Sequence, residues 1–282
     1  MIKRLWNNAV IKAIAAYLIF EIISLAIKFL CNAIGITFPA SNLGELINEV
    51  VKITIPVLIV AFSFKTISTV KDPLKGFGKS FLCGLWFFLL CSAATADLIH
   101  TKISDGSKFK SAIEIVFFAL FIAAVVFSEE LLHRGTITEL LVRRYGDSRK
   151  GKLLTIFLGA ALFSLCHITN LLRGQSLSNT LTQMISVFCF AVFVNTIYVK
   201  YRNLYIAILL HAALDIMTLS EFGLFENKAL EANFTDKESS SLTSFIMCNS
   251  LYIIAAVIIF LVTNRKGGTK RCSKRSLNSS AS

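Results

Sequence analysis

The sequence predicts an all-α protein, a polytopic transmembrane helix bundle of about eight spans with a central polar cavity. Hydrophobic residues make up 55% of the 282 residues and the mean hydropathy is +0.69, whereas soluble domains are about 45–50% apolar. Charged residues are only 16%, and most lie between long apolar runs. Such runs, separated by short charged segments, are typical of helices that cross a bilayer. The cavity is expected because a few ionisable residues lie inside the runs.

Eight apolar runs are long enough to cross a hydrocarbon core, which takes about 20 mostly apolar residues. The polar stretches 97–111 and 220–242 are expected to be loops. The bundle is expected to occupy residues 1–264, followed by a disordered, basic cytoplasmic tail at 265–282. The expected spans are 9–30, 46–64, 77–96, 113–141, 152–171, 181–199, 204–220 and 243–263.

The distribution of basic residues predicts how the chain is oriented in the membrane. The formal net charge is +12, and Lys and Arg concentrate in alternate connections. Because cytoplasmic loops are rich in Lys and Arg, we expect both termini in the cytoplasm and the protein in the plasma membrane. The loop at 31–45 has no Lys or Arg, as the opposite side requires, whereas 97–111 fits least well. No nucleic-acid-binding motif accompanies the charge, so membrane lipid is the expected partner and nucleic acid is not.

Three runs carry ionisable residues at membrane depth, where each charge costs about 3 kcal/mol on insertion scales. Charged residues at this depth therefore need a partner, a wet cavity or a functional purpose. We therefore expect them to form one polar site. They are Glu129, Glu130, His133 and Arg134 in the fourth run, His167 in the fifth, and His211 and Asp215 in the seventh.

Helical spacing gives these residues different roles. Glu130 and Arg134 are four apart, so they share a helix face and can pair. His211 and Asp215 can pair in the same way, the carboxylate fixing the tautomer of the imidazole. Glu129 lies about 100° around the helix from Glu130. Glu129 is therefore not the natural partner of Arg134, and its carboxylate is expected to be available for catalysis.

The depths of the residues support a single site. Counted inward from the basic ends at 1.5 Å per residue, Glu129 and His167 lie about 20 Å deep. His211 comes out at about 14 Å and Asp215 at about 20 Å. Three helices thus bring ionisable groups to similar depth. His133 falls on the helix face of Glu129 and is expected to support the site.

Two hydrolytic chemistries fit this set of side chains. In the first, Glu129, His167 and His211 hold Zn²⁺ or another divalent metal with a water in the open position. In the second, Glu129 acts as general base on a water with His167 as its partner. His211 and Asp215 would then stabilise the oxyanion of a tetrahedral intermediate. The sequence has neither H-E-x-x-H nor G-x-S-x-G, so neither a zincin helix nor a nucleophile elbow is expected.

Other polar residues in the spans are expected to be structural. Asn195 is expected to form a hydrogen bond between helices. Glu21 and Lys28 are expected to lie near span ends, with their charged groups extended to the membrane surface.

Three motifs resemble those of the CPBP family, which comprises type II CAAX prenyl endopeptidases and bacteriocin-processing or bacteriocin-immunity membrane proteins. The resemblance covers roughly 120–220, and it implies that Glu129 and His167 activate water. It also implies that His211 and Asp215 bind the oxyanion or a metal. His133 departs from the family, which commonly has an aromatic or apolar residue there. The motifs are E-E-x-x-x-R (Glu129, Glu130, Arg134), F-x-x-x-H (Phe163, His167) and H-x-x-x-D (His211, Asp215).

The resemblance implies a CPBP-type intramembrane endopeptidase, with or without a metal, that cuts a membrane-associated peptide or protein. A non-proteolytic bacteriocin-immunity protein or signalling scaffold is the alternative that the family also contains. A proton- or cation-coupled transporter would also use buried carboxylates and histidines, but the sequence shows no inverted repeat and no pair of helices broken by Gly or Pro.

Overall fold

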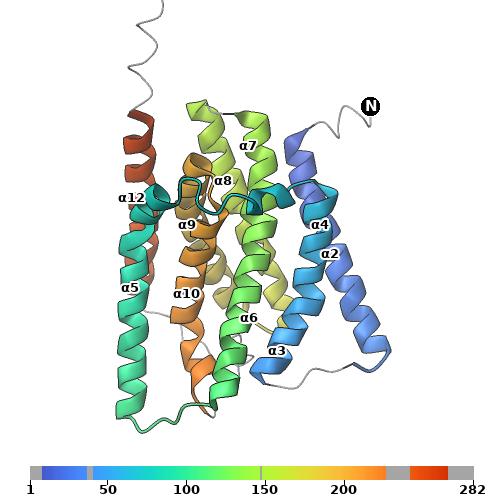
Figure 1. The fold of residues 1–282 in the computed structure, drawn as a ribbon, viewed down its shortest axis with the longest axis vertical. Helices are drawn as coiled ribbons and strands as arrows, with labels where there is room; N and C mark the ends of the chain where they lie inside the picture. Colours follow the sequence, from blue (N-terminus) through green and yellow to red (C-terminus); the bar gives the residue numbers. More distant parts are fainter. Residues whose placement is uncertain (1–7, 37–40, 147, 227–241, 266–282) are drawn as a thin grey trace, which may run out of the picture.

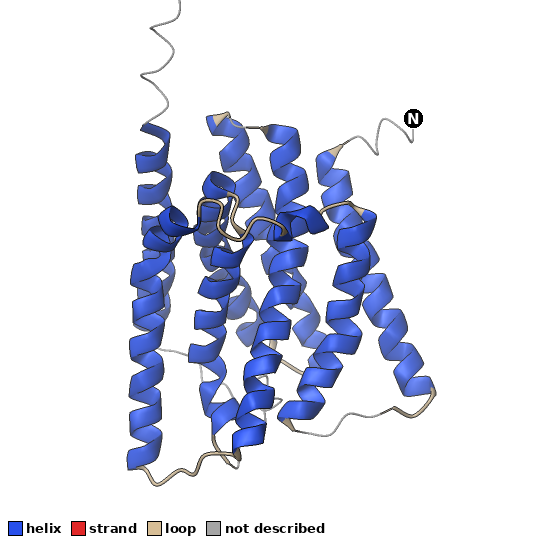
Figure 2. Cartoon of the chain, viewed as in Figure 1, coloured by secondary structure: helices blue, strands red, loops and turns tan. Residues whose placement is uncertain are grey.

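The computed structural model describes residues 8–36, 41–146, 148–226 and 242–265. These residues form helices and connections without a strand, as Figure 2 shows. Eight helical spans in the described part are long and apolar enough to cross a membrane. The predicted fold class is therefore confirmed, and the protein is an integral, multi-pass membrane protein.

The spans follow one another in chain order, and two of them contain a π-helical segment. The first four are α2 (Ala9–Ala33); α3 (Asn42–Glu49), η1 (Val50–Thr54) and α4 (Ile55–Ser63), which are continuous; α5 (Phe77–Ser104); and α6 (Ala112–Glu130), η3 (Leu131–Thr138) and α7 (Glu139–Tyr145), also continuous. The last four are α8 (Arg149–Cys166) with the 3₁₀ helix η4 (His167–Arg173), α9 (Leu177–Tyr201), α10 (Leu204–Leu224) and α12 (Leu242–Arg265).

Short polar side chains mark where many of these helices begin. Each stands just before the first turn and accepts a hydrogen bond from a backbone N–H that has no partner within the helix. These side chains therefore stabilise the first turn of each helix and fix the residue at which it begins. The caps are Asn8, Ser41, Ser111, Ser148, Ser176 and Asn203.

The prediction of a loop at 97–111 is wrong in its first half, because α5 continues to Ser104. Lys102 on this extension forms an ion pair at 2.7 Å with Glu221 of α10, which itself extends to Leu224. Hydropathy marks where the hydrocarbon ends, whereas a helix continues for as long as its backbone hydrogen bonds do. Residues 227–241 of the second predicted loop, and the predicted tail beyond Arg265, lie outside the described residues.

The helices stand side by side, and α2 begins at the same end of the bundle at which α12 ends (Figure 1). This agrees with an even number of spans; that this end is cytoplasmic, and that the membrane is the plasma membrane, stay predictions. α9 lies among α8, α10 and α12 and is largely enclosed. Its Phe190 and Phe193 pack with Phe87 and Tyr252 at ring-centroid distances of 5.7–6.3 Å.

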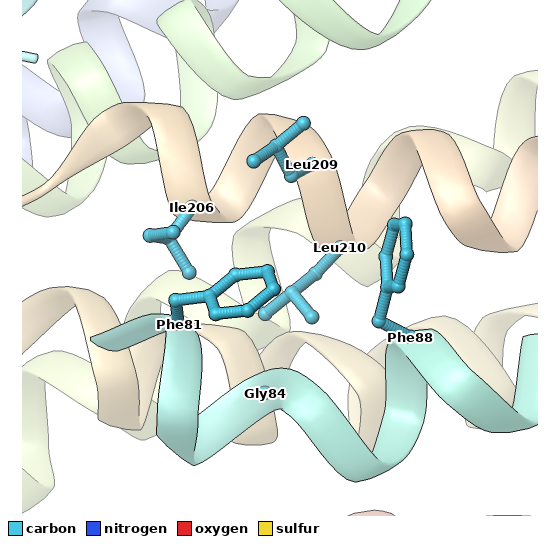
Figure 3. A pocket seen from close by; sticks show the side chains of 6 residues that line it. All are labelled: Phe81, Gly84, Phe88, Ile206, Leu209 and Leu210. Carbon is cyan, nitrogen blue, oxygen red and sulfur yellow. The ribbon is translucent and has the colours of Figure 1, made fainter. Parts of the chain in front are cut away.

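A glycine allows α5 and α10 to approach closely. A Cβ atom at Gly84 would lie 2.6 Å from Cδ2 of Leu210, so any larger residue would displace that leucine. Figure 3 shows Leu210 directed at Gly84, with Phe81 and Phe88 on either side. Because Leu210 directly precedes His211, this contact helps to fix the height of α10 next to the polar site.

Asn42 connects three helices at the end of the bundle opposite the start of α2. Its side-chain amide donates to the carbonyl oxygens of Glu114, at 2.8 Å, and Gly223, at 2.9 Å. Lys110 adds a bond of 2.7 Å to the carbonyl oxygen of Phe222. Partial burial lowers the pKa of Lys110, and the nearby charge of Glu114 opposes the shift. These bonds hold the beginnings of α3 and α6 against the end of α10.

Candidate active site

The acidic motif lies where the helix changes its pitch. Glu129 and Glu130 end α6, and the π-helix η3 follows with His133 and Arg134. A π-helix closes i→i+5 hydrogen bonds, and such segments occur frequently at functional sites. Every residue of η3 is buried, so its polar side chains are directed into the bundle and require partners there.

Glu130 and Arg134 form the predicted ion pair, with Nη1 and Oε1 2.7 Å apart and both side chains fully buried. Arg134 also donates from Nε to Oδ1 of Asn195 at 3.1 Å, and its guanidinium carbon lies 4.4 Å from the centre of the Phe163 ring. Asn195 in turn donates to the carbonyl oxygen of Ile156 at 3.1 Å. The predicted interhelical role of Asn195 is confirmed, and it links η3, α8 and α9.

Gly159 makes this linkage possible, because a Cβ atom there would lie 2.7 Å from Oγ1 of Thr138 and 3.0 Å from Nδ2 of Asn195. Only a residue without a side chain lets α8 pack this closely against η3 and α9. The backbone at Gly159 thereby sets the position of the amide that holds Arg134.

His211 connects the acidic motif to α10. Its Nδ1 lies 2.8 Å from Oε1 of Glu130, and since a carboxylate accepts, Nδ1 carries the hydrogen. Its Nε2 lies 3.6 Å from Oδ1 of Asp215 and 3.8 Å from Oε2 of Glu129. The predicted pairing of His211 with Asp215 is confirmed. The prediction for Glu130 was incomplete, because this carboxylate orients His211 as well as neutralising Arg134.

His167 stands where α8 ends and η4 begins. Its Nδ1 lies 3.2 Å from the carbonyl oxygen of Phe163, and because a carbonyl can only accept, Nε2 is the basic nitrogen. The Phe163 ring packs near both imidazoles, with its centroid 5.5 Å from that of His167 and 5.9 Å from that of His211. The charges of Glu129 and His167 both act on Asp215. The three predicted helices therefore converge at one place.

Exposure distinguishes the two adjacent glutamates. The side chain of Glu130 is fully buried, whereas that of Glu129 is 32% exposed. Asp215 and His211, at 17% and 8%, lie between these extremes. Glu129 is therefore the carboxylate that water or a substrate reaches most readily, and Glu130 is held as part of the scaffold.

His133 lies behind these groups, with Nε2 3.6 Å from Sγ of Cys166 and its ring 4.5 Å from that of Phe163. Tyr17 and Glu21 of α2 lie close to Cys166. The prediction that Glu21 extends to the membrane surface is wrong, because α2 places it mid-helix, facing the polar site. The only feature of the sequence that could have placed Glu21 near the site is its charge inside a span. No feature of the sequence indicates that Tyr17 lies there.

A bound metal at this site is an expectation from the sequence. Among the residues that the structure describes, no three His, Cys, Asp or Glu side chains are grouped as a metal site requires. Zn²⁺ held by Glu129, His167 and His211 stays a prediction.

The fold and the site together define a polytopic membrane protein with one acid–base cluster buried among its spans. Residues 111–217, from α6 into α10, match the family described as Type II CAAX prenyl endopeptidase Rce1-like. The match contains all three motifs and confirms the resemblance to the CPBP family. The proteins of that family are generally proteases, so the match supports a hydrolase. No curated protein and no solved structure matches the chain.

Proposed function

We propose that the protein is an intramembrane endopeptidase that hydrolyses a peptide bond of a membrane-associated peptide or protein. The observation that supports this most strongly is the convergence of Glu129, His167 and the His211–Asp215 pair from three helices. The match to an endopeptidase family over the same segment supports it independently.

Glu129 and His167 activate the water in this proposal. Glu129 is the most exposed carboxylate of the cluster and takes a proton from water as general base. Nε2 of His167 holds the water by accepting its second hydrogen, because Nδ1 is committed to the carbonyl of Phe163. The water oxygen adds to the carbonyl carbon, and the proton then passes from Glu129 to the leaving amine as the C–N bond breaks.

His211 stabilises the oxyanion of the tetrahedral intermediate. Its Nδ1–H is held by Glu130, so Nε2 faces the reaction side. When protonated there, His211 donates a hydrogen bond to the oxyanion in a site where low dielectric strengthens the interaction. Asp215, 3.6 Å from Nε2, stabilises the imidazolium and fixes its orientation.

The family name suggests the substrate class, a peptide with a C-terminal CAAX sequence and a prenylated cysteine. An apolar prenyl chain partitions into the bilayer and brings the scissile bond near the depth of the site. We propose a farnesylated CAAX peptide as the first substrate to test, with an unprenylated peptide of the same sequence as its comparison.

Cleavage by the purified chain in lipid nanodiscs, followed by mass spectrometry, tests the proposal. Glu129→Gln and His167→Gln are each expected to lower kcat/KM by about 10²–10⁴-fold, as loss of a general base does. Glu221→Gln is the matched control, since it removes a carboxylate elsewhere in the bundle and should retain activity. Wild-type rates in both site variants would rule the assignment out.

A bound divalent metal is tested separately. Elemental analysis of active wild-type protein and of the variant His211→Ala decides it. If the zinc prediction is right, about one metal ion per chain is present in the wild type and is lost in the variant. Activity in wild-type protein that contains no metal would contradict it.

A further inference from the structure

A basic cleft of about 520 Å³ opens between α2, α4 and α7, at the end of the bundle where α2 begins. Among the described residues that line it, none is acidic. Its cationic residues come from three separate parts of the chain, so folding is what gathers them. They are Lys12 of α2, Lys65 directly after α4, and Arg143 and Arg144 of α7.

Most of this positive charge has no partner of its own. Arg143 donates to Glu139 at 2.8 Å, but Glu139 also accepts from Arg202. Within the described part of the chain, no ion pair or hydrogen bond engages the side-chain ammonium or guanidinium groups of Lys12, Lys65 and Arg144. The cleft therefore holds a net excess of cations facing one volume.

The backbone at the mouth of the cleft adopts an unusual conformation at Lys65. Lys65 has φ of 56°, a left-handed conformation that few residues other than Gly, Asn and Asp adopt readily. This turn ends α4 and carries the Lys65 side chain to the rim. Glutamine, like lysine, has a long unbranched side chain and meets the same strain at this φ, so it can replace the lysine without adding backbone cost.

The cleft is apolar away from its rim. Its wall follows α2 from Ala9 to Ile19, which is about 15 Å at 1.5 Å per residue. Phe64 and Leu140 complete the apolar part. Cations at the membrane surface above an apolar wall that descends into the hydrocarbon match the two halves of a phospholipid, a charged headgroup and an acyl chain.

We propose that this cleft binds one anionic phospholipid from the adjacent leaflet, its phosphate among Lys12, Lys65 and Arg144 and one acyl chain along Ile19. A free phosphate ion would use the cations but not the apolar wall. The lipid would brace α2 against α4 and α7, and α2 is the helix that brings Tyr17 to the polar site. The binding does not depend on the proposed protease activity.

Native mass spectrometry of the full-length chain tests the proposal, with dioleoylphosphatidylglycerol and dioleoylphosphatidylcholine as the lipids. The double variant Lys65→Gln/Arg144→Gln should bind phosphatidylglycerol about thirtyfold more weakly, at roughly 1 kcal/mol for each cation. Lys71→Gln/Lys75→Gln is the matched control, with the same change in charge at two lysines that follow Lys65 in the connection to α5 and do not line the cleft. It should bind like the wild type, and phosphatidylcholine should bind weakly to all three.

Several outcomes would overturn the proposal. The first is an equal loss of affinity for phosphatidylglycerol in both double variants. The second is equal binding of the two lipids by the wild type, and the third is displacement of the lipid by millimolar inorganic phosphate. A higher KM for peptide cleavage with unchanged lipid binding in the cleft variant would assign the cations to substrate instead. If the first variant melts at a lower temperature than the wild type, Lys12→Gln/Arg144→Gln repeats the comparison with Lys65 and its turn unchanged.

Discussion

Replacing Arg134 by alanine leaves the carboxylate of Glu130 buried without its cation. The two groups are 2.7 Å apart and neither is exposed. Unit charges at that distance attract each other by about 6 kcal/mol at an effective dielectric constant of about 20. Desolvation offsets part of this attraction, and removing one partner of a buried pair costs about 3–5 kcal/mol in practice. We therefore expect Arg134→Ala to lower the free energy of unfolding by about 3–5 kcal/mol.

Removing both charges separates stability from activity. Glu130→Leu/Arg134→Met removes both charges of the pair, and apolar replacement of a buried pair is often neutral or stabilising. We expect the double variant to recover most of the stability lost in Arg134→Ala. It should stay inactive, because His211 loses the carboxylate that holds its Nδ1–H.

Denaturation by SDS in mixed micelles measures the free energies, and Arg143→Ala is the matched control. Arg143 pairs with Glu139 in the same i,i+4 arrangement, but its side chain is 46% exposed. Loss of that pair should change stability by less than about 1 kcal/mol. If Arg134→Ala unfolds no more readily than Arg143→Ala, the assignment of a structural buried pair is refuted.

Three further predictions concern the packing and the chemistry. Asn42→Ala should lower the free energy of unfolding by about 2–3 kcal/mol, since two hydrogen bonds between helices are lost at a buried position; an unchanged unfolding curve would contradict this. Gly84→Val should lower the free energy of unfolding by about 1–3 kcal/mol, because the added side chain overpacks against Leu210. Gly78→Val on the same helix should not cause this loss, since no atom lies within 4 Å of its Cβ position. Asp215→Asn should preserve folding, measured by thermal unfolding, and lower kcat by at least about tenfold with little change in KM, since it weakens an interaction made in the transition state; a change confined to KM would argue for a role in substrate binding.

The sequence predicts the spans well because the signal for a span is local. Hydropathy over about 20 residues, together with a side-chain cap at the start of six of the described spans, indicates where a helix enters the membrane. The extension of α5 to Ser104 was missed because helix formation beyond the hydrocarbon leaves no trace in hydropathy. There it is Lys102, paired with Glu221 of another helix, that stabilises the added turns.

The site divides in the same way between local and distant contacts. The pairs Glu130–Arg134 and His211–Asp215 follow from a spacing of four residues, which the sequence displays directly. The contact between Glu130 and His211 joins residues 81 positions apart and depends on how α10 packs against η3. Helical spacing within one run therefore does not predict it.

A double-mutant cycle on Glu129 and His167 tests the central claim most directly. The two side chains are proposed to act on one water molecule, so kcat/KM for peptide cleavage is measured in Glu129→Gln, His167→Gln and the double variant. The account predicts that the double variant loses about as much as the more impaired single variant, because groups that act as a unit are not additive. Losses that multiply, or a single variant that keeps the wild-type rate, would contradict it.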